Sequence, residues 1–231
     1  MHDYSKLKNI KAKTTDTERI YYTPIGDFPS ITTILGKTAD KMWMDRWKNS
    51  LINKLGSEEE ALQEMKRISK YATDRGTKVH EYAEKHFNGE DIFPDLVKDY
   101  EFHDIQNMTR NLIKATEAGV DEIWAQEIAV YSNVFKSAGR LDMVGIWQGK
   151  SAIIDFKTSK RKKYPRDIID YNIQCTFYAE CHNEIYDTNI KDFVIIIAVE
   201  DKDEAQIFEG KTIYSKGLLK NRINNYYSRE I

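Results

Sequence analysis

The sequence predicts an α/β (α+β) fold, in which helices flank a central mixed β-sheet and the N-terminal half is largely helical. Two observations support this prediction. Apolar residues recur at helical spacing between residues 39 and 118, and capping and stop signals divide this region into several helices. From Val120 onward, short apolar runs separated by turn residues replace that spacing, as is typical of strands.

The chain length of 231 residues allows one substantial domain or two small ones. The sequence contains no internal repeat, no low-complexity segment and no Pro/Gly/Ser-rich linker. We therefore expect a single domain over residues 1–231, with a mostly helical part over 1–119 and a sheet core with C-terminal helices over 120–231.

The charges nearly cancel, because 35 Lys and Arg residues face 37 Asp and Glu residues. Nucleic-acid binding through overall positive charge is thereby excluded, and a polyanion must meet a local basic patch. Cys175 and Cys181 fit no metal-binding spacing and require no disulfide, as in a reducing compartment. No early apolar run resembles a signal peptide, so we expect a cytoplasmic protein, in the host cytoplasm if it is phage-encoded.

Residues 1–29 are mostly polar, and residues 21–28 predict a strand followed by a turn. A short helix follows. The hydroxyl groups at its start either cap the helix or bind a phosphate together with the free main-chain amides. The residues concerned are Ser30, Thr32 and Thr33.

Two helices are predicted over residues 39–54 and 58–73, and the second begins with a capping box. Gly76 is expected to break or bend this helix, and Thr77 to cap its continuation. The continuation carries His80, and a lone helical histidine is usually structural.

A further helix is predicted over residues 95–118, since Pro94 opens it and Gly119 stops it. Its apolar stripe consists of Leu96, Tyr100, Ile105, Met108, Leu112 and Ala115.

A predicted hairpin organises the second half of the chain, with strands over residues 139–147 and 151–157. Alternation places Asp155 and Lys157 on the same face of the second strand. Along the first strand it places Asp142, Val144 and Ile146 on one side and Leu141, Met143 and Trp147 on the other.

If the two strands pair, Asp142 lies near Asp155. Two adjacent carboxylates repel each other and are not easily buried without a counter-charge. The pair therefore predicts a divalent metal with Lys157 beside it, and oxygen ligands favour magnesium or manganese over zinc. The alternative is an exposed ion pair on an edge strand. Glu127, in a predicted strand over residues 123–131, either binds a metal or partner or faces water.

The most basic stretch of the chain follows Lys157. It is either a solvated loop or, beside a metal site, the place where a phosphate backbone binds. Its candidate residues are Thr158, Ser159, Lys160, Arg161, Lys162 and Lys163. The remaining predicted elements are a helix over 167–185 with Gln174 and Tyr178 on one face, a buried strand over 194–199, a strand near 207–208 and a helix over 212–228.

Five motifs, in their order and spacing, resemble the PD-(D/E)xK nucleases, in the RecB-like exonuclease branch that includes phage-encoded exonucleases. They are FPSITTILG at 28–36, RGTKVHEYAE at 75–84, GRLD at 139–142, IIDFKTSK at 153–160 and QCTFY at 174–178. The resemblance implies a restriction-endonuclease-like core and a metal-dependent deoxyribonuclease activity.

The resemblance also implies roles for individual residues. The catalytic residues would be Asp142, Asp155 and Lys157. The metal ligands would be Asp142, Asp155, His80, the carbonyl of Phe156 and Glu127, which stands in the place of the first acidic residue. The residues that support the active site would be Gln174 and Tyr178. The residues that bind DNA would be Arg75 and Thr77, together with the hydroxyl and basic candidates named above.

One or two Mg²⁺ or Mn²⁺ ions are expected, and no iron–sulfur cluster, because the cysteines that hold one in some RecB-like proteins are missing. The expected partner is DNA that is single-stranded or has free ends. Trp43, Trp47 and Tyr82 either stack on the bases of a single strand or pack in the core. The alternatives are a structure-specific or restriction-type endonuclease and a non-catalytic nucleic-acid-binding module.

Overall fold

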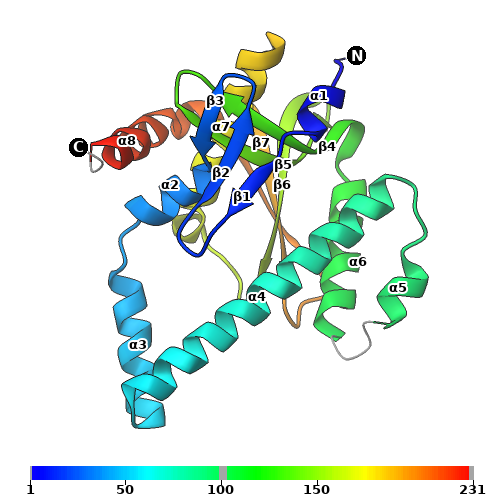
Figure 1. The fold of residues 1–231 in the computed structure, drawn as a ribbon. Coiled ribbons are helices and arrows are strands. Elements are labelled where there is room, and N and C mark those ends of the chain that lie inside the picture. Colours follow the sequence, from blue (N-terminus) through cyan, green and yellow to red (C-terminus); the bar gives the residue numbers. More distant parts are fainter. Residues whose placement is uncertain (1, 99–102, 229–231) are drawn as a thin grey trace.

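A five-stranded sheet with the strand order β4-β5-β6-β7-β8 forms the centre of the molecule (Figure 1). The computed structural model describes residues 2–98 and 103–228. Neighbouring strands are antiparallel, except for the parallel pair β6–β7. The strands are β4 (Val120–Ser132), β5 (Ser137–Trp147), β6 (Lys150–Ser159), β7 (Asp192–Val199) and β8 (Gln206–Lys211). This mixed sheet, flanked by helices, confirms the predicted fold class.

Helices cover both faces of the sheet. One face packs against α2 (Ile31–Thr38), α7 (Ile169–Tyr186) and α8 (Lys216–Tyr227), and the other packs against α4 (Glu58–Phe87), α5 (Phe93–Lys98) and α6 (His103–Glu117). The helix α7 connects the parallel strands β6 and β7, as a crossover between parallel strands requires. Single 3₁₀ turns over Pro165–Asp167 and Thr212–Tyr214 precede α7 and α8.

The predicted sides of β5 are wrong at one point. Leu141 and Met143 were expected to share a side, but Leu141 packs on the α7 face with Val144, and Met143 packs on the α4 face. The regular alternation of the strand is therefore interrupted at Asp142, the residue between them.

The helix α4 runs through Gly76 without a break, so the predicted interruption and the cap at Thr77 are wrong. A side chain at position 76 would bring its Cβ to 3.4 Å from Oγ1 of Thr158 on β6, so glycine allows the helix to lie close to the sheet. The preceding helix α3 (Met42–Leu55) ends at Gly56 with φ 94° and packs against the start of α4. Figure 1 shows these two helices projecting from the body; we call residues 42–70 the helical hairpin.

The predicted helix over 95–118 is described as α5 and α6, and Tyr100 of its apolar stripe lies outside the described residues. The N-terminal residues form α1 (Ser5–Lys8) and a small sheet of β1 (Ala12–Thr14), β2 (Arg19–Thr23) and β3 (Gly26–Pro29). The sequence predicted only a strand and a turn there. Within the described residues, no helix combines the length and the apolar character needed to cross a membrane.

Candidate active site

Three carboxylates, those of Glu127, Asp142 and Asp155, lie on the three neighbouring strands β4, β5 and β6. In the β4–β5 pairing, Gln126 pairs with Met143 and Ile128 pairs with Leu141. Glu127 and Asp142 lie between these two pairs and therefore face each other across the strands. The β5–β6 pairing ends at Met143–Ile154, and Asp142 and Asp155 are the next residue of each strand beyond that pair. The Oδ2 atom of Asp142 accepts a hydrogen bond of 2.6 Å from the main-chain N–H of Phe156 on β6. This bond fixes the carboxylate of Asp142 between the two strands.

The backbone of Glu127 is in the left-handed region, with φ 49°. A residue with a side chain adopts this conformation at a cost of about 1–2 kcal/mol, so the surrounding contacts must hold it. Arg140 does so, because its guanidinium donates hydrogen bonds to the carbonyl oxygens of Glu127 and Ile10. The conformation occurs opposite Asp142, where the alternation of β5 is also interrupted.

His80 reaches the same place from α4. Its Nδ1 atom lies 3.4 Å from Oδ1 of Asp142, and one potential ligand atom from each of His80, Glu127 and Asp142 lies within 4.8 Å of the others. Their elements are far apart in sequence, and the packing of α4 on the sheet brings them together. The predicted residues His80, Glu127 and Asp142 therefore form one group.

Asp155 and Lys157 form an ion pair on β6, and they share a face as predicted. Asp155 is 1% exposed; its Oδ2 atom contacts the ammonium group of Lys157, and its Oδ1 atom has no hydrogen-bond partner among the described residues. The Nζ atom of Lys157 lies 5.2 Å from the ring centroid of Tyr171 on α7 and donates a hydrogen bond of 3.2 Å to the carbonyl of Phe156. Asp155 is not part of the group formed by His80, Glu127 and Asp142, but it interacts electrostatically with Asp142.

Burial and mutual repulsion shift the acids of the site. Burial, and then the charge of Asp142, raise the pKa of Glu127 to about 8. Burial raises the pKa of Asp155 to about 6; Lys157 opposes this rise and Asp142 adds to it. Burial would also raise the pKa of Asp142, but His80 and Lys157 outweigh it and hold that pKa below its ordinary value. Glu127 and Asp155 therefore hold a proton more readily than ordinary carboxyl groups do.

These residues fit a divalent cation on two observations. The grouped donor atoms come from the carboxylates of Glu127 and Asp142 and the imidazole of His80, and oxygen-rich sets of this kind suit Mg²⁺ or Mn²⁺. Lys157 contacts only the Oδ2 atom of Asp155, so the buried Oδ1 atom, which has no hydrogen-bond partner among the described residues, is left for a further cation.

Gln174 and Tyr178 lie next to the site on α7. Nε2 of Gln174 donates a hydrogen bond of 2.7 Å to the hydroxyl of Tyr178. Burial and then the charge of Asp155 raise the pKa of Tyr178 well above its ordinary value. A Cβ atom at Gly139 would lie 2.7 Å from the ring of Tyr178, so the glycine of the GRLD motif allows this tyrosine to approach β5. Support of the active site by this pair stays a prediction.

The predicted DNA-binding residues divide into two groups. The side chains of the first group, which includes Arg75, are engaged in contacts within the protein. It is 4% exposed and donates a hydrogen bond of 2.7 Å to Glu200, so its guanidinium is committed to a buried ion pair. Ser30 is also buried. Its hydroxyl lies 2.9 Å from those of Thr32 and Thr33 and accepts a hydrogen bond from the N–H of Thr33, which is the capping alternative.

In the second group, some of the residues face the cavity or solvent. Thr77 lines the site cavity, and Lys160, Arg161 and Lys162 are exposed. Thr158 is half-buried beside α4, Ser159 is buried and donates to the carbonyl of Arg161, and the main chain of Lys163 is bonded to Gln206.

The sequence predictions missed several residues around the site. A cavity of about 390 Å³ lies over it. The lining residues that were not predicted include Arg19, Glu81, Glu84 and Arg140. Two of them carried a sequence signal, since Glu84 is one turn after His80 on α4 and Arg140 belongs to the GRLD motif. Arg19 carried none, because its position depends on how the small sheet packs.

Comparisons with known proteins point to exonucleases. No family model matches the chain. Mitochondrial genome maintenance exonuclease 1 of Homo sapiens is 26% identical over 187 residues, and the protein of the same name from Xenopus tropicalis is 27% identical over 190 residues. These matches cover 77% and 78% of this chain but 51% of each relative, so the chain spans about half of their length.

A solved structure from Eubacterium rectale, named as a candidate exonuclease, is similar over 68% of this chain and 69% of its own, with 13% identity and a TM-score of 0.43. The sequence matches confirm the resemblance inferred from the motifs. Over about three quarters of its length, the chain is therefore similar to exonucleases, as the motifs predicted.

Proposed function

We propose that this chain is a metal-dependent DNA exonuclease that hydrolyses phosphodiester bonds. The observation that carries the proposal is the convergence of His80, Glu127 and Asp142 beside the Asp155–Lys157 pair. The sequence similarity to a mitochondrial exonuclease supports the same activity and, through its name, DNA as the substrate.

His80, Glu127 and Asp142 would hold one Mg²⁺ or Mn²⁺ ion, and Asp155 with the Phe156 carbonyl would complete its ligands. A bound ion of this kind lowers the pKa of a water molecule and stabilises negative charge on a phosphate. Burial alone would lower the pKa of Lys157, but the carboxylates of Asp155 and Asp142 outweigh burial and raise it. The ammonium group therefore stays charged at neutral pH, and its role is to stabilise the charge that develops on the scissile phosphate.

The exposed aromatic residues of the helical hairpin favour a single-stranded substrate. Trp43 is 59% exposed, and its ring is stacked on that of Trp47 at a centroid distance of 6.3 Å. Exposed aromatic rings bind single strands by stacking on the bases. Tyr82, by contrast, is buried among the residues under α4, so its role is core packing.

The decisive assay compares end-labelled linear single-stranded DNA with closed circular single-stranded DNA in Mn²⁺. An exonuclease degrades the linear strand and leaves the circle intact. Cleavage of both would indicate an endonuclease, and binding without cleavage of either would indicate a non-catalytic module. Asp155→Ala is the matched inactive control.

A further inference from the structure

The site cavity is itself acidic. Four carboxylates line it, from Glu81, Glu84, Glu127 and Asp142, and Arg19 and Arg140 are the cations at its border. A polyanion that approaches these acids is repelled everywhere except at a bound cation. A nucleic-acid strand therefore needs positive charge next to the cavity.

A second groove, of about 600 Å³, meets the cavity at these two arginines. It runs along the small N-terminal sheet, and Lys11 adds a third cation to its lining. None of the described residues that line this groove is acidic. We define Lys11, Arg19 and Arg140 as the basic strip.

The arginines of the strip are held in place before any ligand binds. Nε of Arg19 donates a hydrogen bond of 2.9 Å to Thr14, its partner across β1 and β2. Arg140 is fixed by the carbonyls of Glu127 and Ile10. Since few side-chain rotamers remain to be ordered, phosphate contacts made here cost little entropy.

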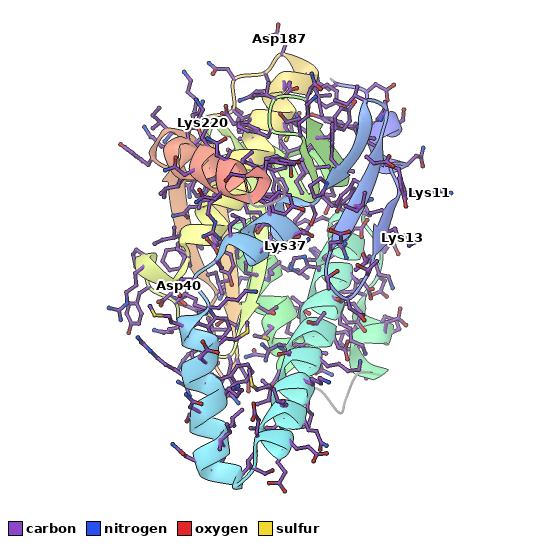
Figure 2. All side chains as sticks on the ribbon, turned by 60° about the vertical axis from the view of Figure 1, so that its left-hand side comes forward. Lys11, Lys13, Lys37, Asp40, Asp187 and Lys220 are labelled. Carbon is purple, nitrogen blue, oxygen red and sulfur yellow. The ribbon has the colours of Figure 1, made fainter. Side chains whose placement is uncertain are left out.

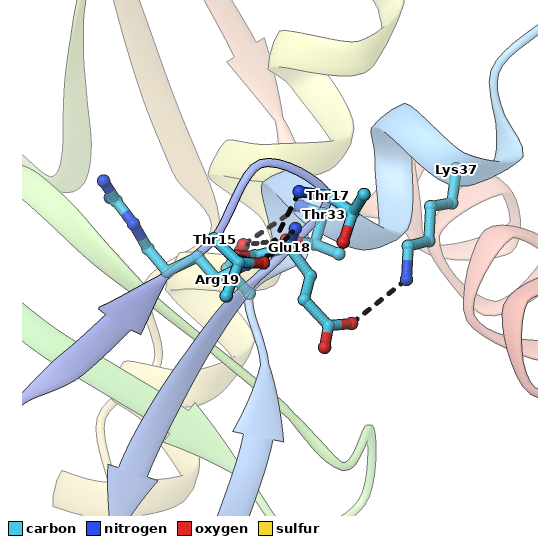
Figure 3. Close-up of polar contacts among 7 residues, drawn as sticks. Thr15, Thr17, Glu18, Arg19, Thr33 and Lys37 are labelled. Atoms are coloured by element: carbon cyan, nitrogen blue, oxygen red, sulfur yellow. Dashed lines mark hydrogen bonds and ion pairs between the residues drawn. The ribbon is translucent and has the colours of Figure 1, made fainter.

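The acid nearest to Arg19 in sequence is engaged elsewhere. Figure 3 shows the side chains of Glu18 and Arg19 extending in opposite directions from the turn before β2. The carboxylate of Glu18 pairs with Lys37 of α2 at 3.1 Å. The guanidinium of Arg19 therefore remains available to an external anion.

We propose that the basic strip binds the phosphates of a single DNA strand on its way to the candidate active site. The inference rests on the proposed nuclease function and extends it, because it assigns a substrate path along the small N-terminal sheet. This path is separate from the basic loop after β6, which follows a different strand of the fold. The sequence did not predict it, since the net charge of the chain is −2.

The test compares two double variants with equal loss of charge. Lys11→Gln/Arg19→Gln removes two cations of the strip. Lys13→Gln/Lys220→Gln is the matched control. Lys13 of β1 is paired with Ile20 of β2 and, among the described residues, is not part of the groove lining. Lys220 is exposed on α8 (Figure 2). The probe is a fluorescein-labelled oligothymidylate of about 20 nucleotides, a length that exceeds a typical single-strand site. Its anisotropy is titrated in Ca²⁺ at several salt concentrations.

The strip variant is expected to bind roughly tenfold more weakly, with the slope of log K against log salt reduced by about 1.4, or about 0.7 for each cation. The control variant should match the wild type in both. If the strip variant and the wild type bind the oligonucleotide equally well, the proposal for the basic strip is wrong. It is also wrong if the control variant loses as much affinity as the strip variant. If the wild-type protein degrades DNA in Mn²⁺ while the strip variant binds normally, only the strip is wrong. If the wild type neither binds nor degrades DNA, the proposed function fails, and the strip fails with it.

Discussion

On β6, Asp155 is 1% exposed, whereas on α3, Trp43 is 59% exposed and, among the described residues of that helix, none is buried. The strand site places charged groups in the protein interior, where they are expensive unless compensated. The helical hairpin places aromatic groups in water, where they gain nothing for the fold. Charged groups are ordinarily exposed and aromatic groups ordinarily buried, and each region reverses one of these two rules. Such reversals are typical of functional surfaces. A mutation at the strand site should therefore lower the rate of DNA cleavage, whereas a mutation in the helical hairpin should weaken the binding of single-stranded DNA.

The largest effect is expected at the strand site. Lys157→Ala removes the cation that faces the scissile phosphate, and we expect the rate of DNA cleavage to fall by about 10³-fold. Binding of single-stranded DNA should change much less, because the hairpin and the basic strip remain. Single-turnover cleavage and anisotropy binding measure the two quantities separately. Cleavage at the wild-type rate would remove Lys157 from the mechanism.

Two ion pairs formed by residues of α4, one exposed and one buried, offer a similar comparison. Arg75→Ala should lower the free energy of unfolding by about 3 kcal/mol, because it leaves Glu200 partly buried without its counter-charge. Lys70→Ala, in the hairpin, breaks an exposed pair with Asp74 and should cost less than about 1 kcal/mol. Urea denaturation measures both. A loss of salt-dependent DNA binding in Arg75→Ala, without destabilisation, would restore Arg75 as a phosphate ligand.

A buried histidine away from both regions predicts a dependence of stability on pH. His182 is bonded to Tyr4 at 3.1 Å and to Thr188 at 2.8 Å. Burial, and then the charge of His2, lower the pKa of His182 to about 4. The unfolded chain, with an ordinary pKa of about 6.5, therefore binds the proton more readily than the folded chain.

Stability is accordingly complete above about pH 6.5 and is lost as the pH falls towards 4, by about 3 kcal/mol in total. Denaturation of the wild type and of His182→Gln between pH 7 and pH 5 should show the steeper loss in the wild type. Parallel curves would mean that the pKa of His182 is the same in the folded and the unfolded chain.

In the helical hairpin, a mutation should weaken DNA binding and leave the rate of cleavage nearly unchanged, the reverse of the result at the strand site. Trp43→Ala is expected to weaken binding of single-stranded DNA by about 1–3 kcal/mol through the loss of stacking. The cleavage rate at saturating DNA and the melting temperature should hardly change, because the side chain is exposed. A marked drop in melting temperature with unchanged DNA affinity would instead make Trp43 a packing residue.

The smallest effect is expected in the loop after β6. Neutralising Lys160, Arg161 and Lys162 should reduce the salt slope of DNA binding by about 0.7 for each phosphate that these side chains neutralise in the wild type. The side chains are exposed, so little change in stability is expected. An unchanged slope would show that the loop is only solvated.

Local patterns predicted the hairpin of β5 and β6, because alternation puts Asp155 and Lys157 on one face and a turn sequence joins the strands. Contacts between distant segments could not be predicted in this way. The family resemblance implied that Arg75 binds DNA. Its actual partner, Glu200, lies 125 residues away, so no local pattern could indicate this ion pair. The interruption at Asp142 depends on the backbone of Glu127, on another strand. The short strand β1 was missed because all three of its residues are exposed and give no apolar pattern.

The central claim is that His80, Glu127 and Asp142 form one cation site that serves DNA hydrolysis. The most direct measurement is Mn²⁺ binding by electron paramagnetic resonance, with digestion of linear single-stranded DNA followed in the same samples. We expect the wild type to bind Mn²⁺ and degrade DNA, Asp142→Asn to lose both, and Asp45→Asn, an exposed acid of α3, to retain both. Mn²⁺ binding and digestion by Asp142→Asn at wild-type levels would contradict the account.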